Sequence, residues 1–391
     1  MLGFLLARAG VNVVVLEKHG DFLRDFRGDT IHPSTLEIMD QLGLADRFLE
    51  LPHSELSNIN GITAGGQQIN LTLKRLRTRF PFIAFVPQWD FLSFVTAEAR
   101  KYPTFRLMMS CEVTGLITEN GAVRGVEYET AGEKREMRAH LTVGTDGRTS
   151  RTRECANLPM VETSPPMDVF WFRLSRKPDE PEALGGRVGA GQLAVLIDRR
   201  SYWQIAYLIP KGDGDRIRGG KLESFRKRVV DLLPEMADRI GELTYWEQVK
   251  LLTVRSDRLT KWYRRGYLAI GDAAHAMSPV GGVGINVAIQ DAVTAANVLW
   301  EPLRERRVTE NDLARIQDER EMPVRLVQAG QSAIQSVLIK RVLRSSTAVQ
   351  FPRVLRLVLG IPIIRDIPPR MVAFGIGRPR VRSPRLSPRP S

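Results

Sequence analysis

The chain has 391 residues, of which 43% are hydrophobic and 26% charged, a composition typical of a soluble globular protein with room for two domains. Its net charge of +13 is spread along the chain without a basic patch that alternates with aromatic residues, so we expect no nucleic-acid partner. Two cysteines, Cys111 and Cys155, are too few for a disulfide framework or a metal cluster, and they favour a reducing, cytoplasmic setting. We expect neither an export signal nor a spanning helix, because no run reaches the ~18 apolar residues that a bilayer requires.

The first residues predict a helix followed by a buried strand. Residues 2–9 carry an apolar face, Gly10 suits a helix C-cap, and Val11 to Leu16 form a β-branched run that ends in Glu17. This order is typical of the second half of a dinucleotide-binding βαβ unit, in which the acid accepts hydrogen bonds from ribose hydroxyls. The glycine fingerprint of such a unit stands about 20 residues before the acid, and would therefore precede Met1. Either Met1 is an internal methionine of a longer gene product, or the chain is truncated and lacks the first strand.

The next segments predict a loop, a helix and the start of a sheet. Arg27 lies in a loop, and Ser34 with Glu37 three residues later has the spacing of a helix capping box. Residues 55–85 alternate polar and apolar positions, as strands do, and a further helix is expected to begin near Asp90.

Residues 105–160 predict a hairpin and a second ligand-binding turn. Asn120-Gly121 separates two strand-like runs, which is a strong hairpin signal. A strand from His140 to Val143 then leads into GTDGRTSRTR, where Asp146 can cap the following helix.

Residues 161–254 are rich in strands and are the expected substrate domain. Five large aromatic side chains there are candidates to line an apolar cavity, although aromatic residues in strands more often belong to the core. They are Trp171, Phe172, Trp203, Tyr207 and Trp246.

The stretch from Gly266 to Trp300 carries the most specific pattern. An apolar strand, Tyr267 to Ile270, is followed by Gly271-Asp272, a glycine-rich loop and a helical pattern from Ile285. A helix N-terminus after such a loop presents backbone N–H groups to an anionic or strongly polar ligand. Asp272 is placed to accept from a hydroxyl, such as one of a ribityl chain. The glycine spacing alone is equally compatible with an ordinary αβ crossover that has a glycine-rich turn and binds no ligand.

The string GDAAHAMSPVGGVGINVAIQDA closely resembles the second flavin motif of the FAD-dependent aromatic-ring hydroxylases, the flavoprotein monooxygenases of the p-hydroxybenzoate hydroxylase type. The stretch around Asp146 and Gly147 resembles the Asp-Gly motif of that family. Gly3 is similar to the small residue that follows the family's glycine fingerprint within the first helix. The resemblance covers residues 1–160 and 255–300 well and the substrate domain poorly.

This resemblance implies FAD as cofactor, NADH or NADPH as co-substrate, and transfer of one oxygen atom from O2 to an aromatic or similarly electron-rich carbon. The chemistry is expected at the flavin C4a position, with no catalytic side chain and with Pro279 near the flavin. His275 is interpreted as structural, and Arg148 and Arg153 are expected to offer charge to phosphates. The cofactor-binding residues implied in this way are Glu17, Arg27, Gln88, Asp146, Gly147, Asp272, Pro279, Gly281, Gly282, Gly284, Ile285 and Asn286.

The predicted fold is α/β, with a Rossmann-like FAD-binding domain that lacks its first strand, an inserted strand-rich substrate domain and a helical C-terminal segment. We assign residues 1–55, 86–160 and 255–305 to the FAD domain and 56–85 and 161–254 to the substrate domain. A helical region spans 306–377, and 378–391 form a basic tail that is expected to be disordered.

The predicted partner is a small aromatic molecule, bound by a monomer or homodimer. The basic amphipathic stretch from Val337 to Leu359 predicts at most a weak peripheral membrane contact. A flavin reductase or halogenase on the same fold, or a truncated non-enzymatic remnant, are the alternatives.

Overall fold

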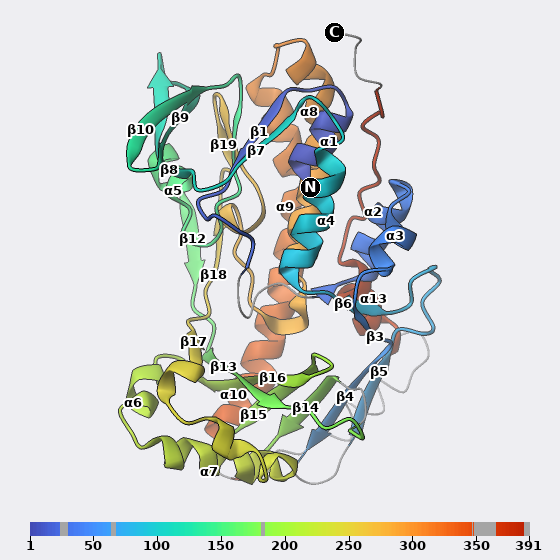
Figure 1. Ribbon diagram of the computed structural model, residues 1–391, viewed down its shortest axis with the longest axis vertical. Coiled ribbons are helices and arrows are strands. Elements are labelled where there is room, and N and C mark those ends of the chain that lie inside the picture. Colours follow the sequence, from blue (N-terminus) through green and yellow to red (C-terminus); the bar gives the residue numbers. More distant parts are fainter. Residues whose placement is uncertain (24–29, 64–67, 181–183, 346, 348–364, 387–391) are drawn as a thin grey trace.

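The computed structural model describes residues 1–23, 30–63, 68–180, 184–345, 347 and 365–386 (Figure 1). Long helices surrounded by short strands form one part of the molecule, and a large sheet forms the other. The helices are α1 (Leu2–Arg8), α2 (Pro33–Gln41), α3 (Ala45–Leu49), α4 (Gln88–Ala99), α5 (Arg151–Ala156), α6 (Gly214–Arg218), α7 (Leu222–Leu232), α8 (Gly284–Arg304), α9 (Glu310–Ile334), α10 (Lys340–Arg344) and α13 (Ile367–Phe374).

The helical part is built around α8, most of whose side chains between Asn286 and Leu299 are buried, both apolar and polar. Helix α1 packs against α8 and α4, and α9 runs beside α8. Their side chains form the largest core of the molecule, which extends to the buried strand before Gly271. The sequence predicted α1 and α8 correctly, and Gly10 adopts the positive φ of 77° that a helix C-terminus often needs.

Two parallel strand pairs flank this core without joining each other. Strand β1 (Val13–Leu16) pairs with β7 (Phe105–Met108), and β11 (Thr142–Gly144) pairs with β20 (Tyr267–Ala269), which also binds β19 (Tyr263–Arg264). Among the described strands, β1 has no partner other than β7, and β11 none other than β20. Val14 on β1 is accordingly 42% exposed, whereas every residue of β20 is buried.

Three small sheets complete this part. The predicted hairpin is present: Asn120 and Gly121, at φ of 50° and 74°, join the first two strands of a three-stranded meander. This meander consists of β8 (Glu112–Glu119), β9 (Ala122–Thr130) and β10 (Glu133–Arg138). The second sheet pairs β12 (Met160–Thr163) with β18 (Ser256–Leu259). In the third sheet, β2 (Thr30–Ile31) and β3 (Ser54–Leu56) lie on either side of β6 (Ile83–Phe85). The last sheet places β6 beside β2 rather than in the large sheet.

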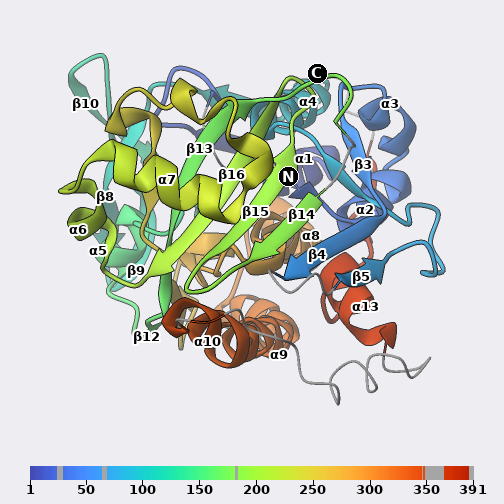
Figure 2. The same cartoon turned by 90° about the horizontal axis from the view of Figure 1, so that it is seen from below.

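The large sheet has seven strands in the order β17-β13-β16-β15-β14-β4-β5, antiparallel except for β14 with β4. Helix α7 lies across one face, as Figure 2 shows from below. Residues of α10 and of the π-helical turn before it pack on the other face. The strands are β4 (Asn58–Thr63), β5 (Gln68–Thr72), β13 (Met167–Ser175), β14 (Leu184–Val188), β15 (Leu193–Asp198), β16 (Tyr202–Pro210) and β17 (Lys250–Leu252).

Two local predictions differ from the structure. The predicted capping box at Ser34 is wrong. Pro33 is the first residue of α2, so the helix begins before Ser34 and His32 is the N-cap. The Glu37 carboxylate accepts instead from the Thr78 hydroxyl, at 2.8 Å. The predicted disorder of the tail does not extend to residues 378–386. There the Leu386 N–H donates to the Arg8 carbonyl, and the Asn297 side chain bonds three backbone groups of residues 380–383. In the described part of the chain, no helix is long and apolar enough to cross a bilayer.

Candidate functional site

The turn after β20 presents Asp272. Strand β20 ends in buried residues, and Gly271 then bends the chain at a φ of 60°. Its carbonyl accepts from the N–H groups of Ala274 and His275 within the turn, and its N–H donates to the Asp291 side chain on α8. A Cβ on Gly271 would lie 3.0 Å from the Ala288 Cβ on α8, so this close approach requires glycine. The next side chain, Asp272, remains 34% exposed although the turn around it is buried.

Asp272 pairs with an arginine from the Asp-Gly motif. The Arg148 Nε donates to its Oδ2 at 3.2 Å, and an Nη of Arg148 donates to the Met277 carbonyl. The two partly exposed side chains therefore place one acceptor beside one cation. The structure brings together two motifs that lie 124 residues apart in the sequence.

The glycine-rich loop leads from this turn to the N-terminus of α8. Gly281 and Gly282 have φ values of 79° and 63°, and the Thr30 hydroxyl donates to the Gly282 carbonyl at 2.9 Å. A Cβ on Gly282 would lie 2.6 Å from the Thr30 Oγ1, so only glycine fits. Helix α8 begins at Gly284 with no side-chain cap and no acid in its first turn, which leaves a positive N-terminus. A Cβ built on Gly284 would lie 3.9 Å from the Asp272 Oδ1, so the start of the helix is close to that carboxylate.

Asn286, predicted to bind the cofactor, makes its hydrogen bonds within the protein. Its Oδ1 accepts from the His32 N–H at 2.9 Å and from the Thr35 hydroxyl at 2.7 Å, and its amide donates to the Thr30 carbonyl at 3.0 Å. This buried side chain ties the start of α8 to the Thr30–Thr35 segment. Ile285 is partly buried against the main core, and Pro279 precedes the loop.

The Asp-Gly motif is organised around its own helix. Asp146 accepts from the Ser150 hydroxyl and from both the N–H and the hydroxyl of Thr152, at 2.5–2.9 Å, so its carboxylate supports the first turn of α5. The N-cap itself is Ser150 rather than Asp146, and its hydroxyl oxygen accepts from the Arg153 N–H at 3.0 Å. Gly147 takes a φ of 82°. Arg153 differs from the prediction: it is buried and donates to the carbonyls of Ala273 and Arg148, so its charge is used inside the protein rather than offered to a phosphate.

The remaining predicted residues lie at the β1 side. Glu17 follows β1, and its side chain accepts from the His19 N–H at 3.0 Å. Gln88 is the first residue of α4 and is partly buried. A cavity of about 380 Å³ lies next to the segment that follows Glu17, between Gly20–Leu23, α4 and β7. Arg27 lies outside the described residues.

The sequence did not identify His32, Asp291 or Arg320, all of which are buried close to the loop. The His32 Nδ1 lies 2.6 Å from the Val372 carbonyl, which can only accept, so Nδ1 carries the proton. Burial lowers the pKa of His32 from 6.5 to about 4, against a smaller opposite effect of that carbonyl. Two local features of the sequence could have pointed to these residues. His32 stands directly before Pro33, which begins a helix, and Asp291 is an acid within an otherwise largely apolar helix pattern.

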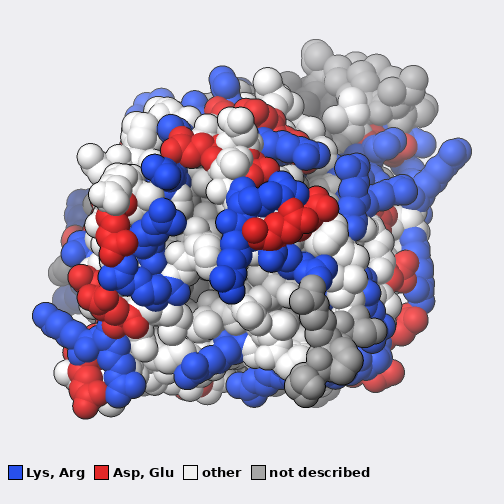
Figure 3. Space-filling view, turned by 90° about the horizontal axis from the view of Figure 1, so that it is seen from above, with Lys and Arg blue, Asp and Glu red and all other residues white. Residues whose placement is uncertain are grey.

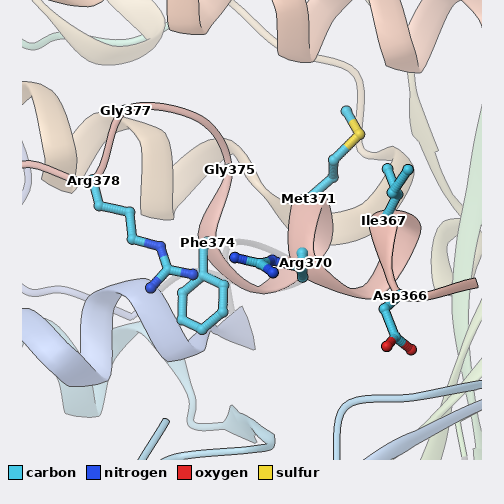
Figure 4. Close-up of a pocket in the computed structure, with 8 residues that line it drawn as sticks. All are labelled: Asp366, Ile367, Arg370, Met371, Phe374, Gly375, Gly377 and Arg378. Atoms are coloured by element: carbon cyan, nitrogen blue, oxygen red, sulfur yellow. The ribbon is translucent and has the colours of Figure 1, made fainter. Parts of the chain in front are cut away.

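Two other features do not belong to this site. A cavity of about 640 Å³ beside α13 is lined by eight residues between Asp366 and Arg378, with Arg370 and Arg378 near Phe374 (Figure 4). Its lining does not include Asp272 or the glycine loop. In Figure 3, basic and acidic side chains are interspersed on the end of the molecule seen from above, in agreement with a spread-out charge. Among the described residues, no group of three His, Cys, Asp or Glu side chains could hold a metal ion.

The chemistry of these groups fits a ligand with hydroxyls and an anionic part. Asp272 supplies an acceptor for a hydroxyl, while Arg148 and the uncapped N-terminus of α8 supply positive charge. The glycine loop between them leaves no side chains at Gly281 and Gly282 to obstruct a flat group. The ribityl and pyrophosphate parts of FAD have these requirements, so the residues present fit the cofactor that the sequence implied.

Comparison with known proteins gives the same result. The FAD binding domain family matches residues 1–329. The 6-methylpretetramide 4-monooxygenase of Streptomyces rimosus is 30% identical over 98% of this chain and 91% of its own length. The rifampicin monooxygenase of Streptomyces venezuelae is 26% identical over 77% of this chain and 61% of its own length.

Solved structures share the fold. PqsL, a probable FAD-dependent monooxygenase from Pseudomonas aeruginosa, has a TM-score of 0.73 at 20% identity, covering 88% of this chain and 93% of its own. The p-nitrophenol 4-monooxygenase PnpA from Pseudomonas putida DLL-E4 has a TM-score of 0.74 at 18% identity, covering 96% and 95%. The chain belongs to the FAD binding domain family. It is an FAD-dependent monooxygenase, an oxidoreductase with the α/β fold that the sequence predicted.

Proposed function

We propose that this protein uses NADH or NADPH and O2 to oxygenate an aromatic small molecule, with FAD held at the turn that carries Asp272. The observation that carries this proposal is the convergence of Asp272, Arg148 and the uncapped N-terminus of α8. Bound FAD would supply the transfer of electrons from NAD(P)H to O2 and the transfer of one oxygen atom to the substrate. Asp272 would orient the ribityl chain, and Arg148 would neutralise phosphate charge.

The substrate is proposed to bind between the glycine loop and the large sheet. Val280, in this loop, packs against the apolar cluster that contains Val169, Leu193 and Leu208 on one face of the sheet. Of the five aromatic candidates, only Trp171 packs on this face. The other four belong to the opposite core under α7. An apolar surface next to the flavin site excludes water and suits a flat aromatic molecule.

The reaction is tested with purified protein, FAD, NADH or NADPH, and a panel of phenols. Oxygen uptake and the product mass are measured together. We expect at least one phenol to gain the mass of one oxygen atom, with consumption of equal amounts of O2 and NAD(P)H. NAD(P)H oxidation that yields only hydrogen peroxide with every phenol would support the reductase alternative. A product that forms only with halide would support the halogenase.

The substrate position is tested by two matched substitutions on adjacent positions of β13. Trp171→Leu should raise the KM for the best phenol at least fivefold with flavin content unchanged. Phe172 packs in the opposite core, so Phe172→Leu should lower stability without changing the KM by more than twofold. Equal effects of the two changes on KM would refute this placement.

We also propose a weak peripheral contact with anionic membranes through the solvent-exposed side of α9 and α10. Exposed apolar residues recur there, followed by exposed cations, as in helices that lie on a membrane surface. Residues 348–359 of the predicted stretch lie outside the described residues. The exposed residues are Met322, Leu326, Ile334 and Val337, with Lys340, Arg341 and Arg344.

This contact is tested by sedimentation with phosphatidylglycerol vesicles. We expect binding that Val337→Glu reduces and that salt screens. Absence of binding at low salt would refute the contact.

Light scattering of the purified protein would distinguish a monomer from a homodimer. We place the reaction in the cytoplasm, where NAD(P)H is available.

A further inference from the structure

A buried ion network lies directly behind the turn that carries Asp272. Asp291, on α8, is fully buried. Its Oδ2 accepts from the Gly271 N–H at 3.0 Å and from the His275 Nε2 at 2.6 Å, and its Oδ1 accepts from the Arg320 Nε at 2.8 Å. One carboxylate thus receives three hydrogen bonds from three separate parts of the chain.

The network holds both ends of the turn. Gly271 stands just before Asp272 and His275 three residues after it, and both donate to the same carboxylate oxygen. The Gly271 carbonyl closes the turn by accepting from the backbone of Ala274 and His275, each at 2.9 Å. Asp272 lies between these anchors, and its carboxylate accepts from Arg148. The turn therefore has little freedom to move its carboxylate.

The charge state of this network follows from its geometry. Burial alone would raise the pKa of Asp291, but His275 and Arg320 outweigh it, so its pKa is lowered and the carboxylate is ionised. An ionised carboxylate only accepts, so the His275 Nε2 carries the proton. The His275 Nδ1 has no hydrogen-bond partner among the described residues, and the ring lies against Trp262 with centroids 4.9 Å apart. His275 thus donates to Asp291 through Nε2.

Arg320 connects the same carboxylate to the C-terminal segment. Besides Asp291, it donates to the Gly377 carbonyl at 3.2 Å and to the Gln290 side chain at 3.1 Å. Gln290 in turn donates to the Phe374 carbonyl at 3.0 Å. Helix α9 and the end of α13 are therefore fixed to the helix that begins at the glycine loop.

We propose that Asp291 is a positioning residue that sets the affinity for FAD by holding the Gly271–His275 turn, with Arg320 and His275 as its side-chain hydrogen-bond donors. This inference rests on the proposed function, because it takes Asp272 as the group that contacts the cofactor. A carboxylate that orients its neighbours through buried hydrogen bonds is the support that a precise ligand site requires.

The large sheet provides a matched control. Asp168 is also buried, at 3% exposed, and its carboxylate accepts from the N–H groups of Gly212 and Val254, both at 2.9 Å, and from the Lys211 Nζ at 2.8 Å. Like Asp291, it accepts three hydrogen bonds, at least one from a backbone N–H and one from a basic side chain, but it holds no part of the turn. A substitution at Asp168 measures the general cost of neutralising such a carboxylate.

The test compares Asp291→Asn with Asp168→Asn in the full chain, by FAD titration and by hydrogen–deuterium exchange of residues 266–283. We expect Asp291→Asn to weaken FAD binding at least tenfold and to accelerate exchange in this peptide at least tenfold. Asp168→Asn should change both by less than twofold. Equal effects of the two variants, or unchanged exchange in Asp291→Asn, would overturn the proposal. The exchange measurement decides this without cofactor.

Substitutions of His275 decide the case if Asp291→Asn does not fold. His275→Gln keeps an N–H that can reach Asp291 and should retain FAD affinity within threefold. His275→Phe removes the donor but keeps a ring against Trp262. It should bind FAD at least threefold more weakly than the Gln variant. Equal affinities would contradict the proposal. If Asp272→Ala loses FAD while the Asp291 and His275 variants do not, the cofactor site stands and only the positioning role fails.

Discussion

The Gly271–Asn286 region and the β1–β7 pair both belong to the predicted cofactor domain, yet they are held in different ways. The first is buried, and Asp291, Thr30 and Arg148 hold it through hydrogen bonds from distant parts of the sequence. The second is a two-stranded pair whose Val14 is 42% exposed. The comparison teaches that the part of the site with the most specific sequence motif is also the part that long-range contacts fix most firmly.

The first prediction compares the two strands that lead into the site. Leu268 on β20 is fully buried, so Leu268→Ala should lower the free energy of unfolding by about 2–5 kcal/mol through loss of burial and a new cavity. Val14→Ala on β1 should cost less than about 1 kcal/mol, because much of that side chain already faces water. Urea unfolding measures both. Equal losses would show that β1 is as firmly packed as β20.

The second prediction concerns the glycine loop. Gly282→Ala places a Cβ 2.6 Å from the Thr30 Oγ1 at a positive φ, so we expect a loss of about 2–3 kcal/mol from backbone strain and displacement of Thr30. Gly147→Ala also has a positive φ, but its Cβ would meet nothing within 4 Å, so it should cost only the strain of about 1–2 kcal/mol. Thermal unfolding compares the two variants. A Gly147 variant that is the less stable of the two would contradict the close contact at Thr30.

The third prediction concerns acid. The folded protein holds His32 neutral with a pKa of about 4, and the unfolded chain protonates it near the ordinary 6.5. Its contribution to stability is therefore complete above pH 6.5 and falls as the pH drops toward 4, by up to about 1.4 kcal/mol per pH unit. His32→Gln, which can still donate to the Val372 carbonyl, should flatten this slope in urea unfolding. Exposed His19→Gln is the control. Identical slopes for His32→Gln and the unmodified protein would refute this account.

The sequence was informative where function depends on neighbouring residues. The strand, Gly271-Asp272, the glycine loop and helix α8 follow one another within 40 residues, so their order predicted the structure. The resemblance of this string to a family's flavin motif predicted the cofactor. The hairpin at Asn120-Gly121 was predictable for the same reason, because its turn chemistry is local.

Features that depend on distant partners could not be predicted. Nothing local shows that Arg153 is buried against the Ala273 carbonyl, or that Arg320 pairs with Asp291 across 29 positions. The five aromatic residues of the substrate domain divided between two faces of one sheet, and the face that meets the glycine loop depends on how the two parts pack. The capping box failed because Pro33 competes for the same helix start.

The most direct measurement of the central claim is the flavin content of Asp272→Ala, compared with Asp231→Ala, which removes a carboxylate from the surface of α7. Both variants are purified in the presence of FAD, and the bound flavin is determined from its absorbance. Loss of the hydroxyl acceptor should abolish bound flavin in Asp272→Ala and leave Asp231→Ala equal to the unmodified protein. Unchanged flavin content in Asp272→Ala would contradict the assignment of this turn as the cofactor site.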